Sequence, residues 1–266
     1  MNSEEKPQKV SILVLTRNEE AQIERCLSSA AWADEILVVD AMSSDHTREI
    51  AEAPGRAYSG KVRFVSRLWS GFRDQRNFAL EQASNDWVFF LDADEAVSPE
   101  LRERLTSLMK MPGGPPYRYY KVRRKEYFLG KPIEYGIWNP SYQDRFFHRS
   151  GVRYVNEVHE YPVFPQPPQS LHEPILHSPE FSIEKFLDKM NRYTSIEASD
   201  RFRQGQRTSA FKLVFAFPAM LYKNYFYYQA YRDGYHGFVI SLLEGVSRVV
   251  RHMKMWQLEQ RENRKK

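Results

Sequence analysis

Four short apolar runs alternate with helix-like segments in the first hundred residues, and this alternation constrains the fold more than any other feature. The apolar runs indicate strands over 10–16, 35–40, 61–66 and 87–91. The segments between them have helical spacing over 19–30, 43–53 and 73–83. Continuous apolar strands that alternate with helices are typical of a mostly parallel sheet covered on both faces. The sequence therefore predicts an α/β fold for this part of the chain.

Polar and acidic side chains follow three of the four predicted strands. Thr16 is followed by Arg17, Asn18 and Glu19, and the second strand ends at Asp40. The fourth is followed by Asp92, Asp94 and Glu95. Because ligands of open α/β sheets bind beyond the carboxyl ends of the strands, we expect these groups to share one edge.

The most informative stretch is Asp92-Ala93-Asp94, at the end of an apolar strand. One carboxylate there can face a ribose, and the other can bind a divalent cation, since Mg²⁺ is held through one or two carboxylates plus substrate phosphates. Such a cation offsets the charge that develops on a departing diphosphate. The simpler alternative is an acidic turn before a helix that starts at Ser98-Pro99-Glu100.

A nucleotide-hydrolysing P-loop is a rival interpretation. An apolar strand that ends in acidic residues resembles a Walker B element, and residues 55–61 match the first part of a phosphate loop. The match fails at Val62, where Ser or Thr would bind Mg²⁺. The context also differs, because a P-loop opens a helix and this segment precedes a strand.

Two further groups are candidates for nucleotide binding. Asp40 ends a wholly apolar strand and can accept hydrogen bonds from a ribose or a base, whereas Ser43, Ser44 and Asp45 suit helix capping. Arg76 lies in a basic helix start after Gly71, where it can meet an anion. A solvated helix face is the alternative for Arg76.

The second half has weaker patterns. A loop or turn at 111–116 precedes an alternating basic and aromatic segment, 117–128, which suggests an antiparallel strand. Residues 130–180 have no clean period. Helical spacing returns behind a Ser182 cap.

Composition limits the partners and the location. The net charge of +5 favours an anionic partner such as nucleotide phosphates, a membrane surface or nucleic acid. Cys26 is the single cysteine, which we expect to be a small buried apolar residue. The polar N-terminus has no signal-peptide core, and no run is long enough to span a membrane. We therefore expect a cytoplasmic protein.

Aromatic residues and lysines are interspersed over 211–231, and Pro218 interrupts the run. This composition suits the headgroup boundary of a bilayer and predicts peripheral contact with an anionic inner leaflet. A helical lid over the catalytic domain or a subunit interface in a homo-oligomer is the equal alternative.

The ordered motifs of residues 10–100 resemble the nucleotide-binding half of family 2 glycosyltransferases, which have the GT-A fold. The matching features are Thr16-Arg17-Asn18-Glu19, Asp40 with its Ser/Asp/Thr turn, Arg76-Asn77 and Asp92-Ala93-Asp94. The resemblance implies that Thr16, Asn18, Glu19, Asp40 and Arg76 bind the nucleotide. It implies that Asp92 and Asp94 meet the ribose, the diphosphate and a divalent metal, Mg²⁺ or Mn²⁺, with Asp94 as the direct ligand.

The second half resembles a narrower group, the bacterial lipopolysaccharide-core β-glucosyltransferases. The matching segments are Gln143–Phe147, Val158–Glu160, Pro174–His177, Lys189–Tyr193, Asp233–Gly237 and Lys254. The extra loop Phe164–Gln169 departs from that pattern, as does Ala41-Met42, where many members have a second acidic residue.

The resemblance implies an inverting transfer, which needs one general base near the acceptor hydroxyl. Glu160, beside His159, is the first candidate and Asp144 the second. His177 is a candidate for the metal shell or the diphosphate, although a lone histidine is more often structural. Arg145 is a candidate partner for phosphates.

We therefore expect a GT-A domain over 1–180, with a nucleotide-binding half at 10–100 and an acceptor half at 101–180, followed by a helical region over 181–266. The expected reaction moves a hexose, glucose from UDP-glucose, to a lipopolysaccharide-core or related cell-surface glycan at the inner face of the plasma membrane. A transferase that acts on a polyprenyl phosphate or a peptide side chain is the alternative. A nucleic-acid module would instead need an exposed basic stripe with interleaved aromatics, and we expect no nucleic acid partner.

Overall fold

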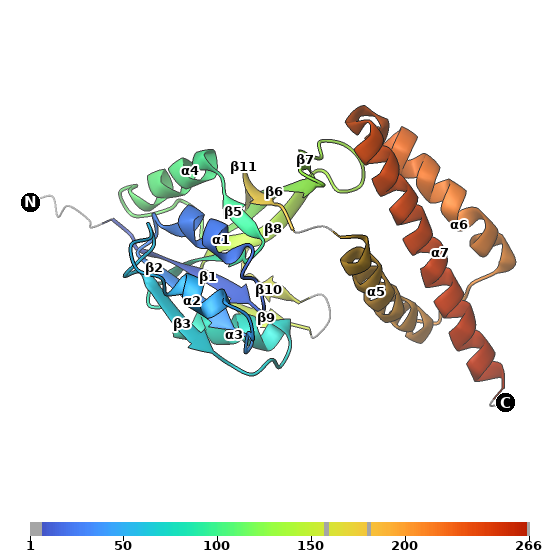
Figure 1. The fold of residues 1–266 in the computed structure, drawn as a ribbon, viewed down its shortest axis with the longest axis horizontal. Helices are drawn as coiled ribbons and strands as arrows, with labels where there is room; N and C mark the ends of the chain where they lie inside the picture. The colour runs from blue at the N-terminus through green and yellow to red at the C-terminus, as the bar shows by residue number, and fades with distance from the viewer. Residues whose placement is uncertain (1–6, 157–159, 180–181, 265–266) are drawn as a thin grey trace, which may run out of the picture. The chain divides into compact units, whose positions relative to one another are not determined.

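A computed structural model describes residues 7–156, 160–179 and 182–264 (Figure 1). Its contacts divide the chain into two compact units. One contains the described parts of 1–125 and 141–178, and the other contains 126–140 and the described parts of 179–266. The sequence analysis did not assign residues 126–140 to the helical region. We call the two the catalytic unit and the helical unit.

The first half of the central sheet is parallel and follows the predicted strands. In the order β3-β2-β1-β4, these strands are Val62–Ser66, Glu35–Asp40, Val10–Thr16 and Trp87–Asp92. The register pairs Thr16 with Asp40, and Leu15 with Asp92. The parallel pairing therefore brings three polar strand ends to one edge.

The second half of the sheet continues with antiparallel pairs between β4 and β8 and between β8 and β6. Apart from β7, the strands that follow β4 in the sequence are β5 (Glu95–Val97), β6 (Tyr119–Phe128), β8 (Ser141–His148), β9 (Arg153–Val155), β10 (Tyr161–Val163) and β11 (Gln169–His177). The strand predicted over 117–128 is confirmed as antiparallel. Residues 141–177, for which the sequence had no clean period, supply β8 to β11.

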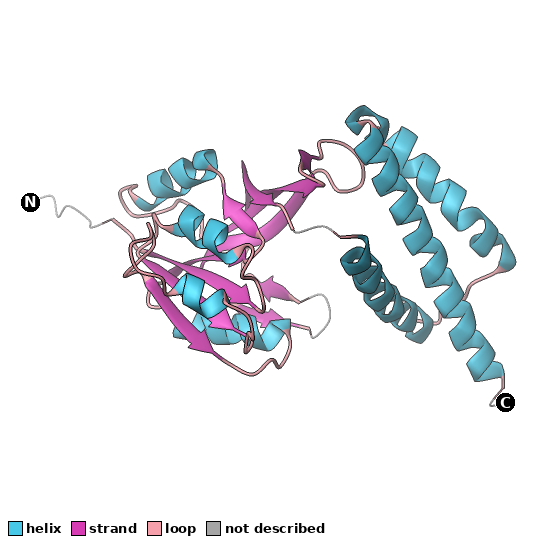
Figure 2. Cartoon of the chain, viewed as in Figure 1, coloured by secondary structure: helices cyan, strands magenta, loops and turns pink. Residues whose placement is uncertain are grey.

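Alternate side chains of the parallel strands pack into two separate cores. Ile12, Val14 and Phe89 face one core, with α1 (Ile23–Ala30) and α4 (Pro99–Met109). Leu13 and Phe90 face the other core, with α3 (Phe72–Gln82). Helices thus cover both faces of the sheet, as the continuous apolar strands predicted (Figure 2). Cys26 belongs to the first core and is fully buried, as expected.

Two helices are shorter than the sequence predicted. The first begins at Ile23 rather than Glu19, and α2 spans Thr47–Ala51 rather than 43–53. Residues at the expected start of the first helix make long-range hydrogen bonds instead. The N–H of Glu19, for example, donates to Thr47 Oγ1 (2.8 Å). Asn18 adopts a left-handed conformation (φ 55°), which is incompatible with a right-handed helix at that residue.

The helical unit contains α5 (Ile183–Arg203), α6 (Ala210–Tyr222), a π-helical turn (Lys223–Tyr227), a 3₁₀ turn (Ala230–Asp233) and α7 (Tyr235–Asn263). The Ser182 cap is confirmed, because its side chain accepts from the N–H of Lys185 (3.0 Å). Residues 126–140, which include β7 (Lys131–Pro132), pack in the same unit. No helix among the described residues is long and apolar enough to cross a membrane.

The Asp233-Gly234-x-x-Gly237 motif has a structural role in this unit. Carboxylate oxygens of Asp233 accept from the N–H groups of Glu134 (3.1 Å) and Tyr135 (2.9 Å). Gly237 lies against the turn before it, where a Cβ atom would be 1.8 Å from the carbonyl oxygen of Ala230. The motif therefore holds segment 133–136 and allows close packing.

Candidate active site

The loops after β1 and β2 are joined by hydrogen bonds at the edge of the sheet. The N–H of Asn18 donates to Ser43 Oγ (2.8 Å), and Asn18 Oδ1 accepts from the N–H of Ser44 (2.8 Å). Asp40 accepts from both the N–H (2.9 Å) and the hydroxyl of Ser43. Ser43 thus orients the buried Asp40 carboxylate rather than capping a helix.

Thr16 lies beside this edge with an unused hydroxyl. The residue is 6% exposed, and its Oγ1 atom has no hydrogen-bond partner among the residues that the structure describes. A buried hydroxyl without a partner costs about 1–3 kcal/mol. Native proteins rarely leave such an atom without a partner, so this hydroxyl can accept one from a bound water or a ligand.

Asp92 is held by two buried arginines. Arg145 from β8 places both terminal nitrogens on the carboxylate, with Nη1 at 3.2 Å from Oδ1, and Arg76 from α3 donates Nη2 to Oδ1 at 3.2 Å. Burial acts to raise the pKa of Asp92, but the charges of Arg145 and Arg76 hold it well below the usual aspartate value. Asp92 is therefore a firmly ionised anchor for two guanidinium groups.

Glu95 extends this charge cluster into the protein. It is fully buried, and its Oε1 atom accepts a hydrogen bond from Arg145 Nη2 (2.9 Å). The same oxygen lies 3.7 Å from Nη1 of Arg124 in β6. Burial raises the pKa of Glu95, against the charge of Arg145 and with a contribution from Asp92. Arg145, which the sequence analysis assigned to phosphates, therefore has carboxylate partners in this structure, and its phosphate contact stays a prediction.

A cleft of about 160 Å³ opens next to the cluster. Its lining residues come from α3, β8, β9 and the segment around β10: Arg76, Tyr142, Gln143, Asp144, Arg145, Tyr154, Glu160, Tyr161 and Pro162. Both predicted base candidates, Asp144 and Glu160, thus line one cleft. His159, the neighbour of Glu160, lies outside the described residues.

The two base candidates have different surroundings. Glu160 Oε1 lies 3.3 Å from Arg76 Nε. Burial raises the pKa of Asp144, opposed by Lys121 and Arg145. Arg76 also lies over the ring of Phe90 (5.1 Å) and that of Tyr154 (5.5 Å), and its Nη1 atom has no hydrogen-bond partner among the described residues. The cleft therefore contains ionisable groups and a buried donor with remaining capacity.

Asp94 points to a different partner from Asp92. Its Oδ2 atom lies 3.2 Å from His177 Nε2, at the end of β11. The carbonyl oxygen of Asp94 accepts from Arg25 Nη2 (2.6 Å) and from the N–H of Ser178 (3.2 Å). The structure thus brings together two of the three side chains predicted to bind a metal, from positions 83 residues apart, whereas the third, Asp92, contacts Arg76 and Arg145.

The Asp94–His177 pair fits a divalent cation in part. A carboxylate and an imidazole suit Mg²⁺ or Mn²⁺, with oxygen ligands from substrate phosphates completing the shell. Within the described ranges, no group of three or more His, Cys, Asp or Glu side chains could hold a metal ion. The pair would therefore supply two ligands, and water or substrate oxygens would complete the shell.

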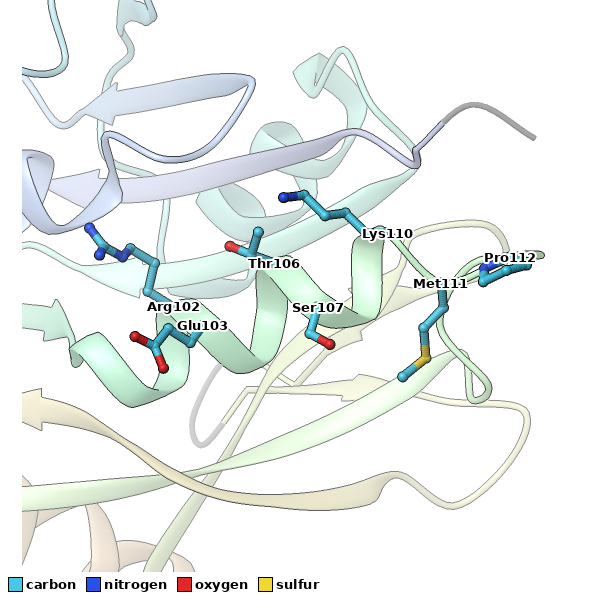
Figure 3. A pocket seen from close by; sticks show the side chains of 7 residues that line it. All are labelled: Arg102, Glu103, Thr106, Ser107, Lys110, Met111 and Pro112. Atoms are coloured by element: carbon cyan, nitrogen blue, oxygen red, sulfur yellow. The ribbon is translucent and has the colours of Figure 1, made fainter. Parts of the chain in front are cut away.

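A second and larger hollow lies on α4, with a volume of about 670 Å³ (Figure 3). One helix and the turn after it form this hollow, through Arg102, Glu103, Thr106, Ser107, Lys110, Met111 and Pro112. It contains none of the predicted site residues, and each lining side chain is at least partly exposed. We therefore assign the chemistry to the smaller cleft.

The sequence analysis missed four residues of the site. Glu95 was noted as acidic but given no role, and Tyr154, Arg25 and Arg124 were not singled out. The run Asp92-Ala93-Asp94-Glu95 contained a signal for Glu95. The other three contact the site only through tertiary structure, so no local pattern could identify them.

Segment 117–128 does not form an exposed basic stripe. It is largely strand β6, in which Tyr119, Tyr120, Val122 and Phe128 are buried. The rings of Tyr119, Tyr120 and Phe128 pack in the interior, as when Tyr120 stacks on Phe146 with 5.4 Å between ring centroids. These rings are not available for stacking on bases, as a nucleic-acid module would require.

Comparisons with known proteins agree with this geometry. The model of the family described as glycosyl transferase family 2 matches residues 11–161. The chain is 28% identical to the lipopolysaccharide core biosynthesis glycosyltransferase LpsC of Rhizobium meliloti (strain 1021), over 93% of this chain and 92% of that protein. It is also 28% identical to an uncharacterized glycosyltransferase of Rickettsia bellii (strain RML369-C), over 94% of this chain and 87% of that protein.

Among solved structures, the chain is similar to the mannosyltransferase PcManGT from Pyrobaculum calidifontis in complex with GDP-Man and Mn²⁺. The TM-score is 0.51 at 16% identity, and the match covers 94% of this chain and 89% of that chain. At this identity the likeness shows the fold alone, and it confirms the GT-A fold expected from the sequence. Because the family model spans more than half of the sequence, the chain belongs to glycosyl transferase family 2.

Proposed function

We propose that this glycosyltransferase moves a hexose, glucose from UDP-glucose, to a lipopolysaccharide-core or related cell-surface glycan, with inversion to a β-linkage. The observation that carries the proposal is a pair of buried polar atoms with unused capacity, Thr16 Oγ1 at the end of β1 and Arg76 Nη1 on α3. These atoms lie where ligands of α/β sheets bind. The name of the relative LpsC supports the acceptor class.

The nucleoside would be recognised at the first two strand ends. Thr16 and Asp40, neighbours in the strand register, would offer a hydroxyl and a carboxylate to the base and the ribose. Asn18 and Glu19 would shape the loop around the nucleoside, because their backbone groups are fixed by Ser43 and Thr47. Preorganised partners of this kind reduce the ordering cost of binding.

The diphosphate would lie between the Asp92 and Asp94 sides of the site. Asp94 and His177 would hold Mg²⁺ or Mn²⁺, with Asp92 close to the ribose and diphosphate. A metal bound there supplies positive charge to the leaving diphosphate. The Nη1 group of Arg76 would donate a hydrogen bond to the nucleotide sugar, while Asp92 holds the guanidinium group of Arg76 in place. Arg145 supports Asp92 from the other side and would add a positive charge near the phosphates.

The acceptor hydroxyl would enter the cleft that Glu160 and Asp144 line. One of these carboxylates would remove the hydroxyl proton during attack, on the side opposite the leaving diphosphate. Glu160 remains our first candidate. Asp144 is a strong second, because its raised pKa brings it closer to the range of an effective base.

A hydrolysis and transfer screen tests the reaction class. The full chain would be incubated with UDP-, GDP- and ADP-sugars, with and without Mn²⁺, and release of the nucleoside diphosphate measured. We expect release from a UDP-hexose that depends on the metal and rises when a truncated lipopolysaccharide core is added. Stimulation by polyprenyl phosphate instead would favour the alternative acceptor, and no release from any donor would contradict the proposal.

The base assignment needs a separate experiment. A Glu160→Ala protein that binds the donor and keeps full transfer activity would remove Glu160 from the mechanism. A matched Asp144→Asn variant would then be expected to lose transfer while it keeps donor binding.

We also propose that the enzyme works at the cytoplasmic face of the plasma membrane, where a lipid-linked acceptor glycan would be presented. The proposal includes neither a nucleic acid partner nor a required oligomer.

A further inference from the structure

A row of exposed apolar side chains runs along one side of α6 and into the π-helical turn. Phe211, Val214, Phe215, Tyr222 and Phe226 form this row, which we call the α6 stripe, and each is exposed. The first four recur at the three- and four-residue spacing of one helix face. Phe211 contacts Phe215 (4.4 Å between centroids), and Tyr222 contacts Phe226 (5.6 Å), so a pair of rings lies at each end of the stripe.

The stripe is not needed to hold α6 in the helical unit. The opposite side of the helix provides that packing through Ala216 and Met220, which are buried. Phe217 lies against α7 so closely that a Cβ atom on Gly245 would be 2.8 Å from its ring. The exposed aromatics therefore need an explanation other than core packing.

The π-helical turn extends the stripe. Asn224 is fully buried in this turn, where its Oδ1 accepts from the N–H of Ile137 (2.7 Å) and its Nδ2 donates to Ser241 Oγ (2.9 Å). With Asn224 fixed inward, Phe226 and Tyr227 are 56% and 71% exposed. Single π-turns in helices often mark functional positions.

The chain segment that contains the stripe has charges of one sign. Residues 201–232 contain six Lys or Arg and no Asp or Glu. Some of these cations are paired, as Arg207 is with Glu262 of α7 (3.2 Å). Lys212 and Lys223 adjoin the stripe and have no carboxylate partner among the residues described by the structure. The partner of this surface should therefore be both apolar and anionic.

We propose that the α6 stripe docks on the surface of an anionic lipid bilayer, with its aromatic rings at the headgroup boundary and Lys212 and Lys223 against lipid phosphates. Tyr and Phe next to lysines suit this boundary. A symmetric interface with a second copy fits less well, because it would bring the lysines of two identical surfaces together. The proposal does not depend on the donor or the acceptor of the transfer reaction.

Vesicle flotation of the full chain tests this proposal. Vesicles of phosphatidylglycerol mixed with phosphatidylcholine would be compared with pure phosphatidylcholine, at low and high salt. We expect the protein to float with the anionic vesicles at low salt and much less at high salt, because salt screens the lysine contacts. A Phe211→Ser/Phe215→Ser/Phe226→Ser variant should bind at least about tenfold more weakly, since each buried aromatic contributes strongly to partitioning.

Two further variants separate the contributions. Lys212→Glu/Lys223→Glu should lose the preference for anionic vesicles. Leu187→Ser removes an exposed apolar residue from α5 of the same unit and should bind like the unmodified protein. All variants should keep the thermal unfolding midpoint and the rate of donor hydrolysis.

Three results would overturn the proposal. The first is no flotation of the unmodified protein with anionic vesicles at low salt. The second is equal binding by the triple serine variant and the Leu187→Ser control. The third is a dimer by light scattering that the serine variant converts to monomers without any change in vesicle binding, which would assign the stripe to a second copy.

Discussion

The two units each bury a cluster of polar groups, but the clusters differ in how completely their atoms are paired. In the helical unit, both carboxylate oxygens of Asp233 accept from backbone N–H groups. The side-chain amide of Asn224 accepts from a backbone N–H and donates to the hydroxyl of Ser241. In the catalytic unit, Thr16, Arg76 and Arg145 each keep a buried polar atom without a hydrogen-bond partner in the described part of the chain. We call Asp233 and Asn224 the hairpin anchor, and we call Thr16, Arg76 and Arg145 the donor cluster.

This difference separates structural from functional polar groups. A fully paired buried group fixes one conformation, and its loss leaves its partners unsatisfied. A buried group with unused capacity is costly to the fold, and in a site it can be satisfied by a ligand. Substitutions in the hairpin anchor should therefore affect stability, and those in the donor cluster should affect binding and turnover.

The largest effect on activity is expected at Asp94. Replacing Asp94 with Asn removes the carboxylate that we assign to the metal, so transfer should fall by about a thousandfold or more. The free energy of unfolding should change little, since Asp94 is partly exposed and its ion pair with His177 contributes about 1 kcal/mol or less. Steady-state kinetics and urea denaturation would be measured on the same protein. Retained activity would remove Asp94 from the reaction.

The second effect concerns the general base and its pH dependence. If Asp144 is the base, it must be ionised, so kcat/KM should fall as the pH decreases through its pKa. That pKa is raised by burial, so the decrease should begin at a higher pH than for an ordinary aspartate. Asp144→Asn should lower transfer by about a hundredfold to ten-thousandfold.

Glu160→Gln provides the matched comparison for this experiment, because both carboxylates line the same cleft. The variant with the greater loss of turnover at unchanged donor affinity identifies the base. Equal and small losses would show that neither residue takes the proton.

The hairpin anchor should show the opposite response. Asp233→Ala leaves the N–H groups of Glu134 and Tyr135 without their carboxylate partner and should lower the free energy of unfolding by about 2–3 kcal/mol. Donor hydrolysis per folded molecule should stay the same. Calorimetric melting combined with an activity assay below the transition would check this. A loss of hydrolysis without a loss of stability would contradict the comparison.

The smallest effect is expected at Thr16. Valine has nearly the same shape but lacks the unpaired hydroxyl, so Thr16→Val should leave stability unchanged or slightly increased. Donor affinity should fall by up to about tenfold, the value of one hydrogen bond. Titration calorimetry with UDP would measure it. A destabilised variant with normal affinity would show that the hydroxyl serves the fold.

The parallel half of the sheet could be predicted from the sequence because its strands are buried on both faces and read as continuous apolar runs. In the antiparallel half only β6 could be predicted, because strands such as β8 and β11 mix polar and apolar residues that serve the site as well as the core. Helix starts were misjudged where side chains bond across loops, as between Glu19 and Thr47. Local patterns do not contain such long-range hydrogen bonds.

The candidate site shows the same limit. The sequence identified Asp92 and Asp94 as a pair, but the structure gives them different partners. Arg145 and His177, which lie on strands far along the chain, separate the two carboxylates into an arginine-bound anchor and a histidine-paired group. Their identity was predictable from residue type and family resemblance. The resemblance also implied that Asp94 is the direct metal ligand, but the arginine and histidine partners that distinguish the two carboxylates depended on tertiary structure.

The most direct test of the proposed donor site is a calorimetric titration of UDP-glucose into the full chain, with Mn²⁺ and with a chelator, repeated on Asp94→Asn. Our account predicts saturable binding at one site that is tighter with Mn²⁺, and loss of that metal dependence in the variant. Equal binding with and without metal in both proteins, or no binding of any nucleotide sugar, would contradict it.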